Sequence, residues 1–254
     1  MRGCYGRFAD LYDRLMDDVD YDAWADSVCK LFGVYGEPGG VRTVTDCACG
    51  TGAVTVRLAE RGYRTTGIDL SPDMLRVAQD KARAHGLSVP FAQMDITAFR
   101  THRKADAVIC CCDGVNYLTG EERVRAFFNS ANENLRDGGL LLFDLSTPYK
   151  LEHVLGCSTM GEDRKECTYL WENTFDPVSG LLEMRLHFFV PEGNGYYTRF
   201  DETHIQKSYS IEQIGVLLDG CGFVLLEAKE AFTGKEPGPE CERIQYVARK
   251  KGNI

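Results

Sequence analysis

The chain lacks the features that would direct it to a membrane or to a nucleic acid. No apolar run is long enough to span a bilayer, and the first 18 residues contain no apolar core of a secretion signal. A reduced cytoplasm is therefore the compartment we expect. Positive charge is also not in excess, because 29 Lys and Arg stand against 38 Asp and Glu, a net charge of −9. That balance disfavours a partner held through its phosphates, so we expect no nucleic acid and no membrane as partner.

Zinc-binding spacing is missing as well. There are 11 cysteines, but neither the pair Cys47 and Cys49 nor the run at 110–112 has the C-x-x-C spacing of a zinc site. Neighbouring residues of a strand also point to opposite faces, which separates such thiols further. We interpret these cysteines as small buried hydrophobic side chains and expect no metal site.

What is present is a regular alternation of strand and helix patterns in a chain of 254 residues, 44% of them hydrophobic. Its length allows one large domain, or a core domain with an elaboration. Short apolar runs predict strands at 41–47, 63–69, 89–94, 105–112 and 140–145, separated by helices at 53–61, 72–85 and 121–136. This order predicts an α/β fold whose parallel sheet carries helices on both faces and binds ligands at the carboxyl ends of its strands.

Different patterns occur before and after this alternation. Apolar residues at intervals of three and four predict a helix over 7–19 and a second helix after Asp20. After Pro148, three strands at 167–175, 181–190 and 196–206 are joined by two hairpin turns, which predicts an inserted antiparallel meander. The core then resumes with a helix at 210–219 and strands at 223–229 and 243–249. The predicted domains are lid helices (1–36), a core (37–147 and 208–254) and an antiparallel β subdomain (148–207).

The stretch at 41–52, VRTVTDCACGTG, combines a strand, an acidic residue and a glycine turn that leads into a helix. Glycine lets a ligand approach the backbone N–H groups closely, which makes this turn a small-molecule site. Dinucleotide binding requires G-x-G-x-x-G, but Gly50 and Gly52 are followed by Thr55 at the third position. The incomplete motif weakens the case for a nucleotide-dependent oxidoreductase, which is retained as an alternative.

An acidic residue lies at or just after the end of each of the first four strands: Asp46, Asp69, Asp95 and Asp113. Together with the glycine turn, this series resembles the class I methyltransferases that use S-adenosylmethionine, over residues 41–145. The chain departs from the family at Ala48, where glycine is more usual. The resemblance implies a Rossmann-like seven-stranded sheet of order 3-2-1-4-5-7-6 with an antiparallel last strand, and S-adenosylmethionine as cofactor.

The resemblance also implies which residues hold the cofactor. The backbone of Ala48, Gly50 and Gly52 would face its methionine and ribose parts, and Asp46 its amino group. Asp69 would accept both ribose hydroxyls, since a carboxylate takes two donors at once. The adenine would lie between Leu70 and Met74, with its amine facing Asp95 and Ile96 beside it. Helix capping is the alternative role for the carboxylates of Asp69 and Asp95.

The stretch at 112–118 stands where this family places the transferred methyl group. Asp113 has two candidate roles, balancing the sulfonium or holding an amine nucleophile, and Asn116 or Tyr117 would orient the nucleophile. The alternative is that all three only shape a turn. No N-P-P-Y sequence of the kind associated with base-amine methylation is present. Positioning supplies much of the rate in such a transfer, and His204 is the candidate general base because imidazole titrates near neutrality.

Aromatic residues near the start of the chain complete the expected site. Tyr5, Phe8 and Tyr12, with Trp24, resemble the lid of small-molecule methyltransferases related to glycine N-methyltransferase and to sugar N,N-dimethyltransferases. An aromatic ring attracts a sulfonium cation, although packing alone would also explain these residues. We expect a small-molecule acceptor methylated at nitrogen, with the meander covering the substrate or forming a homodimer contact. A protein that binds S-adenosylmethionine without catalysis is the remaining alternative.

Overall fold

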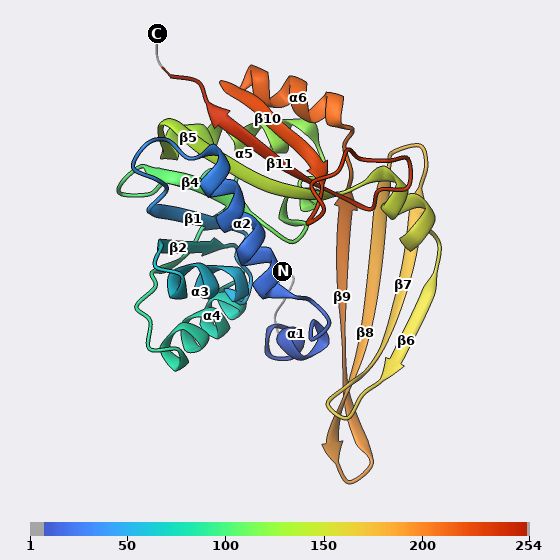
Figure 1. Cartoon of the computed structure of the whole chain (residues 1–254). Helices are drawn as coiled ribbons and strands as arrows, with labels where there is room; N and C mark the ends of the chain where they lie inside the picture. The colour runs from blue at the N-terminus through green and yellow to red at the C-terminus, as the bar shows by residue number, and fades with distance from the viewer. Residues whose placement is uncertain (1–7, 253–254) are drawn as a thin grey trace.

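A computed structural model describes residues 8–252, and its centre is a seven-stranded sheet (Figure 1). The strands are β1 (Thr43–Cys47), β2 (Arg64–Asp69), β3 (Phe91–Gln93), β4 (Ala105–Cys110), β5 (Leu135–Ser146), β10 (Phe223–Glu230) and β11 (Arg243–Lys250). Their order is β3-β2-β1-β4-β5-β11-β10, and β11 pairs antiparallel with both neighbours. The predicted order 3-2-1-4-5-7-6, with an antiparallel last strand, is confirmed.

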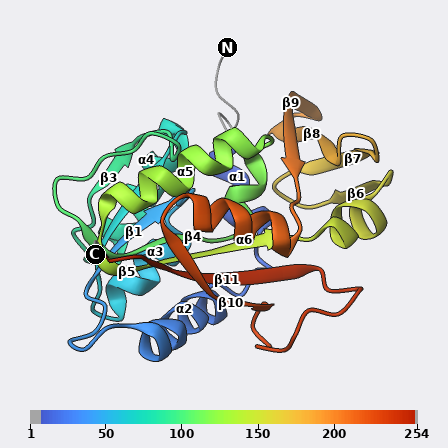
Figure 2. The same cartoon turned by 90° about the horizontal axis from the view of Figure 1, so that it is seen from above.

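Helices cover the two faces of this sheet (Figure 2), and an apolar cluster packs on each face. On one face, α2 (Tyr21–Tyr35) and α3 (Ala53–Glu60) pack on alternate strand residues such as Ala107 and Ile109. On the other face, α5 (Glu121–Asn134) and α6 (Ile211–Gly220) pack on Val108 and Cys110. Successive strand residues thus serve opposite faces, as a doubly covered sheet requires. A further helix, α4 (Pro72–Ala84), is capped by the Ser71 side chain, which accepts from the Met74 N–H.

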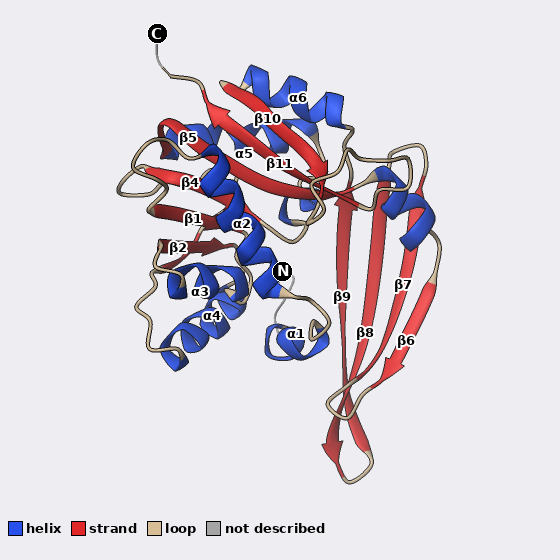
Figure 3. Ribbon diagram, in the orientation of Figure 1, coloured by secondary structure: helices blue, strands red, loops and turns tan. Residues whose placement is uncertain are grey.

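The insertion between β5 and α6 is a second, four-stranded antiparallel sheet (Figure 3). It follows the π-helix η2 (Lys150–Leu155) and contains β6 (Thr159–Asp163), β7 (Thr168–Asp176), β8 (Leu181–Gly193) and β9 (Tyr196–Lys207), in that order. The three predicted strands and their two hairpins are confirmed. Strand β6 escaped prediction because all five of its residues are exposed, so it has no apolar alternation. The division into three domains and the homodimer contact stay predictions.

Two element boundaries differ from the sequence-based expectation. Strand β5 begins at Leu135, whereas the predicted helix continued to residue 136 and the strand began at 140. The Asp137-Gly138-Gly139 stretch therefore belongs to the strand, and an irregularity in the β4–β5 register accommodates it. At the start of the chain, α1 (Ala9–Leu15) is shorter than the helix expected over 7–19. Within residues 8–252, no helix combines the length and the apolar character that crossing a membrane requires.

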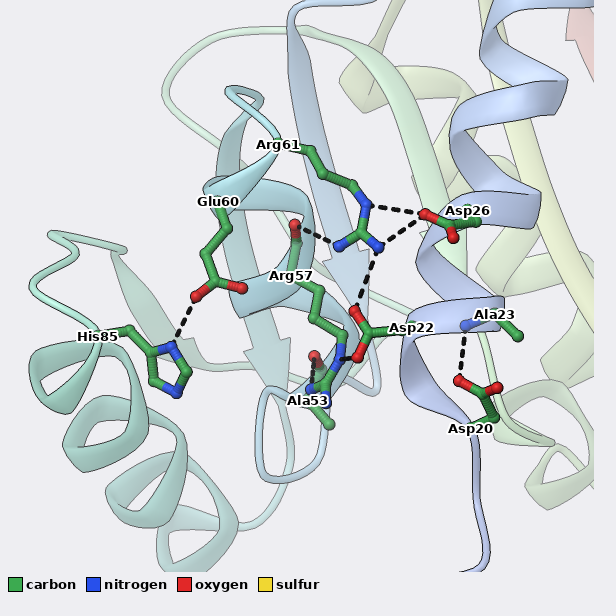
Figure 4. Close-up of polar contacts among 9 residues, drawn as sticks. All are labelled: Asp20, Asp22, Ala23, Asp26, Ala53, Arg57, Glu60, Arg61 and His85. Atoms are coloured by element: carbon green, nitrogen blue, oxygen red, sulfur yellow. Dashed lines mark hydrogen bonds and ion pairs between the residues drawn. The ribbon is translucent and has the colours of Figure 1, made fainter.

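Ion pairs beside the apolar face of α2 attach this helix to α3 (Figure 4). Arg61 pairs with both Asp22 and Asp26, and Arg57 pairs with Asp22. The two aspartates are well exposed, so these pairs add little stability and mainly fix the orientation of the helix. The Asp20 side chain caps α2 by accepting the Ala23 N–H at 2.8 Å.

Replacing Gly52 by alanine tests how tightly the glycine turn packs against the sheet. Gly52 has φ +73°, and an added Cβ would lie 2.9 Å from Ala78 Cβ and 3.3 Å from the Phe91 ring. Gly86 has nearly the same φ, +70°, with no atom within 4 Å of an added Cβ. We expect Gly86→Ala to cost about 1–2 kcal/mol from left-handed strain, and Gly52→Ala about 1–3 kcal/mol more from overpacking. Urea unfolding measures both losses, and equal losses would contradict the packing role.

Candidate functional site

A cavity of about 860 Å³ opens at the carboxyl ends of the parallel strands. Its wall combines loops of the core with α1 and with the inner face of the inserted sheet. The wall contains most of the predicted site residues: Tyr12, Asp46, Ala48, Gly50, Asp69, Leu70, Met74, Asp95, Ile96, Asp113 and His204. Among the described residues, the predicted Gly52, Trp24 and Asn116 do not line it. Tyr5 lies outside the described residues.

The turn after β1 exposes its backbone to the cavity at Gly50. Ala48 and Gly50 both have φ +54°, and a Cβ added at Gly50 would meet no atom within 4 Å. The space beside Gly50 is therefore open to a ligand, as the sequence predicted. Gly52 is different, because Ala78 and Phe91 crowd the position of its missing Cβ. Its need for glycine comes from packing, and the cofactor contact expected of its backbone stays a prediction.

Ala48, the departure from the usual glycine, is accommodated by a glycine opposite. A Cβ added at Gly114 would lie 3.1 Å from the Ala48 methyl and 2.5 Å from Cys110 Sγ. A larger residue at 114 would therefore collide with this turn. The alanine methyl occupies room that Gly114 leaves, so the substitution preserves the shape of the turn.

Asp69 holds two loops of the site together. Its Oδ2 accepts the Gly50 N–H at 2.9 Å and its Oδ1 accepts the Ser71 N–H at 2.8 Å. Burial raises the pKa of Asp69, against the lowering effect of these backbone donors. Each carboxylate oxygen keeps a further lone pair for a ligand hydroxyl. The Asp69 side chain can therefore make the two loop contacts and the predicted ribose contacts at the same time.

Asp46 is a buried carboxyl on the same wall. Burial raises its pKa to about 7; the hydroxyl of Thr55, which donates to Oδ2, lowers it, and the charge of Asp69 raises it. At neutral pH this carboxyl is thus only partly ionised. A bound cation would favour the ionised form, which suits the side chain to an ammonium or sulfonium ligand.

Asp95 begins a turn beside two apolar walls. Its Oδ1 accepts from the backbone N–H and the hydroxyl of Thr97, at 2.8 and 2.7 Å, and its Oδ2 lies 3.3 Å from Arg123. Burial alone would raise the pKa of Asp95, but Thr97 and Arg123 outweigh it and the pKa is lowered. Met74 and Ile96 are buried, whereas Leu70 is 63% exposed. These side chains form a slot with an ionised carboxylate at one end, which suits a flat ring bearing an amine.

The turn after β4 carries unusual backbone angles. Cys112 and Asp113 both adopt left-handed conformations, with φ +61° and +66°, before the 3-10 helix η1 (Gly114–Tyr117). Two consecutive non-glycine residues in this region are strained and require support from their surroundings. The Asp113 N–H donates to the Asp144 carboxylate at 3.2 Å, and Asp113 Oδ1 accepts from the Ser146 hydroxyl at 2.8 Å. Both supports come from β5.

Arg243 pairs with the carboxylate of Asp113 and was missed in the sequence analysis. Its Nη1 donates to Asp113 and to the fully buried Asp144, and its Nη2 lies 3.1 Å from Asp113 Oδ2. In the sheet, Arg243 stands opposite Ser146. Only the predicted sheet order, which places the last strand beside the fifth, offered a signal for this contact.

The ion pairs change the role expected of Asp113. Burial would raise the pKa of Asp113, but Arg243, Lys150 and Ser146 together lower it. Burial raises the pKa of Asp144 to about 6, although Arg243 opposes the rise. Since Arg243 already balances Asp113, the structure favours the turn-shaping alternative over a free counter-ion for the methyl donor.

Asn116 is a correction to the predicted catalytic set. Its side chain is fully buried, and both ends bond to main-chain atoms. Oδ1 accepts the Ser146 N–H at 3.0 Å, and Nδ2 donates to the carbonyls of Ser146 and Lys207 at 3.1 and 2.9 Å. The amide thus ties the turn to the ends of β5 and β9, which leaves it no orienting role toward a nucleophile.

Trp24 is the second correction. Its ring packs edge-on against Phe232, with centroids 4.7 Å apart, and Arg243 lies 5.5 Å over it. These residues line a separate, smaller pocket. Trp24 sits on the buried face of α2 and supports Arg243 from the side away from Asp113, so it acts through packing.

Helix α1 closes the cavity between the core and the inserted sheet (Figure 1). Asp13 accepts from Thr51 at 2.6 Å and pairs with Lys81 at 2.8 Å, which binds the helix to the glycine turn and to α4. On the other side, Arg164 from the insertion pairs with Asp17 at 3.0 Å. Phe8 and Tyr12 reach the cavity from this helical segment. Polar contacts thus hold this helical segment to the core on one side and to the insertion on the other.

His204 lies on the insertion side of the cavity. It is buried, and its Nδ1 is 3.3 Å from the hydroxyl of Tyr117, which also lines the wall. Burial lowers the pKa of His204 to about 4, so the imidazole is neutral at pH 7. It can accept a proton there, although such a low pKa makes it a weak base.

Known proteins share this combination of sheet, glycine turn and insertion. A family model described as a methyltransferase domain matches residues 44–139. A putative methyltransferase of a Geobacillus species is 39% identical over 246 residues, 97% of this chain and 99% of that one. A dTDP-3-amino-3,4,6-trideoxy-alpha-D-glucopyranose N,N-dimethyltransferase of Streptomyces venezuelae is 32% identical over 202 residues, 78% of this chain and 81% of that one.

A solved structure agrees over the whole chain. The S-adenosylmethionine-dependent methyltransferase from Clostridium acetobutylicum has a TM-score of 0.87 and 34% identity, and the match covers 98% of this chain and 100% of that one. The oxidoreductase and the non-catalytic alternatives find no support in these matches. The open backbone at Gly50 and the three acidic residues at the carboxyl ends of β1, β2 and β3 fit the ligand that such proteins use. The chain therefore belongs to the class I S-adenosylmethionine-dependent methyltransferases, and S-adenosylmethionine is its cofactor.

Proposed function

We propose that the protein methylates a small molecule at an amine nitrogen, in the cytoplasm. The observation that carries this proposal is the cavity itself. The acidic residues expected to bind the cofactor line one side of it, the insertion lines another, and α1 lines it between them. A space of about 860 Å³ suits small molecules and excludes a folded macromolecule. The names of the relatives support nitrogen, since one acts on an amino sugar. All ten described cysteines are free thiols, which fits a reducing compartment.

The chain's own residues would act mainly by positioning. The cofactor supplies a methyl group on a sulfonium, and Asp46, Asp69 and Asp95 would orient its amino group, ribose and adenine. The lid and the inserted sheet would exclude water and align the acceptor nitrogen with the methyl group. Neutral His204, beside Tyr117, could accept a hydrogen bond from the acceptor nitrogen, but its pKa of about 4 makes it too weak a base to deprotonate an ammonium, so the amine would lose its proton to water before it binds. Much of the rate would come from alignment in a closed site.

A methyl-transfer screen tests the acceptor class. We expect S-adenosylhomocysteine to form with members of a panel of amines and amino sugars, and mass spectrometry to place the new methyl group on nitrogen. Carboxylates without an amine serve as the matched set. Turnover confined to oxygen or carbon acceptors would show that the nitrogen assignment is wrong.

Replacing Asp69 tests the predicted ribose contact. Asp69→Ala removes an acceptor of two charge-assisted hydrogen bonds, each worth about 1.5–3 kcal/mol, so we expect S-adenosylmethionine affinity to fall at least about a hundredfold. Titration calorimetry measures the affinity. Asp80→Ala, on the exposed side of α4 outside the cavity, is the control and should bind as the wild type does. Unchanged affinity in Asp69→Ala would refute the contact.

Binding should also depend on pH through Asp46. Its pKa of about 7 in the empty site would fall when a cation binds, so binding releases a proton and affinity rises with pH. Between pH 6 and 8 we expect a gain of about tenfold, levelling off above the pKa. Asp46→Asn cannot ionise and should lose this part of the dependence. A wild-type affinity that is flat, or as steep in Asp46→Asn, would contradict the assignment.

A further inference from the structure

Lys150 is a cation on the cavity wall without an ion pair. Seven charged side chains line the cavity: Asp46, Asp69, Asp73, Asp95, Asp113, Arg123 and Lys150. Arg123 is engaged by Asp95. Among residues 8–252, no carboxylate lies within 4.0 Å of the Lys150 ammonium.

Three carboxylates act on the Lys150 ammonium: Asp113 and Asp144 already pair with Arg243, and Glu242 is exposed and makes no contact with Lys150 within 4.0 Å. Arg243 pairs with both Asp113 and Asp144, and the Ser146 hydroxyl also donates to Asp113. Burial lowers the pKa of Lys150, and the charge of Arg243 lowers it further. A partly buried ammonium with three donors gains most from an acceptor that brings its own negative charge.

The sheet order places Lys150 away from the cofactor residues. Asp46, Asp69 and Asp95 lie at the carboxyl ends of β1, β2 and β3, whereas Lys150 begins the π-helix after β5. Strand β4, with the Asp113 turn, lies between these two groups. The segment from η2 onward contributes an apolar part of the wall, with Leu155, Trp171, Met184 and Leu186, and a polar part on β9, with Thr203, His204 and Gln206. A cation beside an apolar surface suits a molecule with an anionic group on a hydrophobic body.

We propose that Lys150 binds a carboxylate or phosphate group of the methyl acceptor, and so selects anionic acceptors over neutral ones. The proposal rests on the proposed function in taking this part of the cavity as the acceptor site. The apolar wall would hold the body of the acceptor and the ammonium its anionic end. These two contacts would fix the direction in which the nucleophile points toward the cofactor.

Calorimetry on the protein loaded with S-adenosylhomocysteine tests this with three probes of similar shape. Phenylacetate carries a carboxylate, phenyl phosphate a phosphate, and 2-phenylethanol no charge. We expect at least one anion to bind the wild type about tenfold or more tightly than the alcohol does. The tighter of the two anions tells which anionic group the site prefers. An equal or weaker affinity for both anions would overturn the proposal without any variant.

Variants then assign the preference to this residue. Lys150→Gln should bring both anions to the affinity of the alcohol, whereas Lys150→Arg, which keeps the charge, should retain most of the preference. Lys165→Gln, an exposed lysine of the insertion, is the matched control and should change nothing. An anion preference that survives in Lys150→Gln would place the anion elsewhere and overturn the assignment.

Cofactor titrations of the same proteins keep the two proposals apart. Lys150→Gln should bind S-adenosylmethionine as the wild type does, because Lys150 lies beyond the Asp113 turn. If the anions show no preference while the amine screen succeeds, the Lys150 proposal alone fails. If the anions bind through Lys150 and no amine is methylated, the nitrogen assignment alone fails.

Discussion

The site depends on one partly buried guanidinium, that of Arg243, held between Asp113 and the fully buried Asp144. It joins the last strand to the turn after the fourth strand, and these are not neighbours in the sheet. Removing Arg243 would leave the buried Asp144 carboxylate uncompensated, and the loss of one partner of a buried ion pair typically costs about 3–5 kcal/mol. The pairing holds Cys112 and Asp113 in left-handed conformations that neither residue favours. The turn that faces the methyl donor is therefore shaped by the end of the chain as much as by its own sequence.

A second set of polar contacts, made by Asn116 and α1, fixes the position of the inserted sheet. Asn116, two residues beyond Gly114, bonds to the ends of β5 and β9, so one amide fixes both the entry and the exit of the insertion. Helix α1 then spans from the glycine turn to Arg164 on the far side. The hydrogen bonds of Asn116 and the polar contacts of α1 thus fix the elements around the cavity, and apolar side chains pack between them. A methyl-transfer site benefits from such fixed walls, because alignment is its main source of rate.

Much of the fold could be read from the sequence because its signals are local and repeated. The two hairpins follow from apolar periodicity and turn residues, the strand order follows from the family resemblance, and the structure confirms both. Strand β6 lay beyond prediction because its exposed residues carry no periodic pattern. Prediction of the site residues from the sequence had similar limits. Acidic residues at strand ends indicated the cofactor wall, but the partners of Asp113 and Asn116 come from 30 to 130 positions away and depend on tertiary structure.

Two corrections have a common physical cause. Trp24 was assigned to the site by the resemblance to a lid, and Asn116 by the stretch that stands where the family places the methyl group, yet Trp24 is buried against Phe232 and Asn116 is buried and hydrogen-bonded to main-chain atoms. A side chain whose polar atoms or ring faces are already engaged has little left to offer a ligand. By the same reasoning, the informative residues of the cavity are those that still have a lone pair or a charge to offer a ligand. Asp69 keeps lone pairs, Asp46 is a carboxyl that a cation would ionise, and Lys150 is an ammonium without an ion pair among residues 8–252. If Lys150 binds the acceptor as proposed, the cavity would have an acidic cofactor end and a basic acceptor end, and this polarity would give a methyl acceptor one orientation.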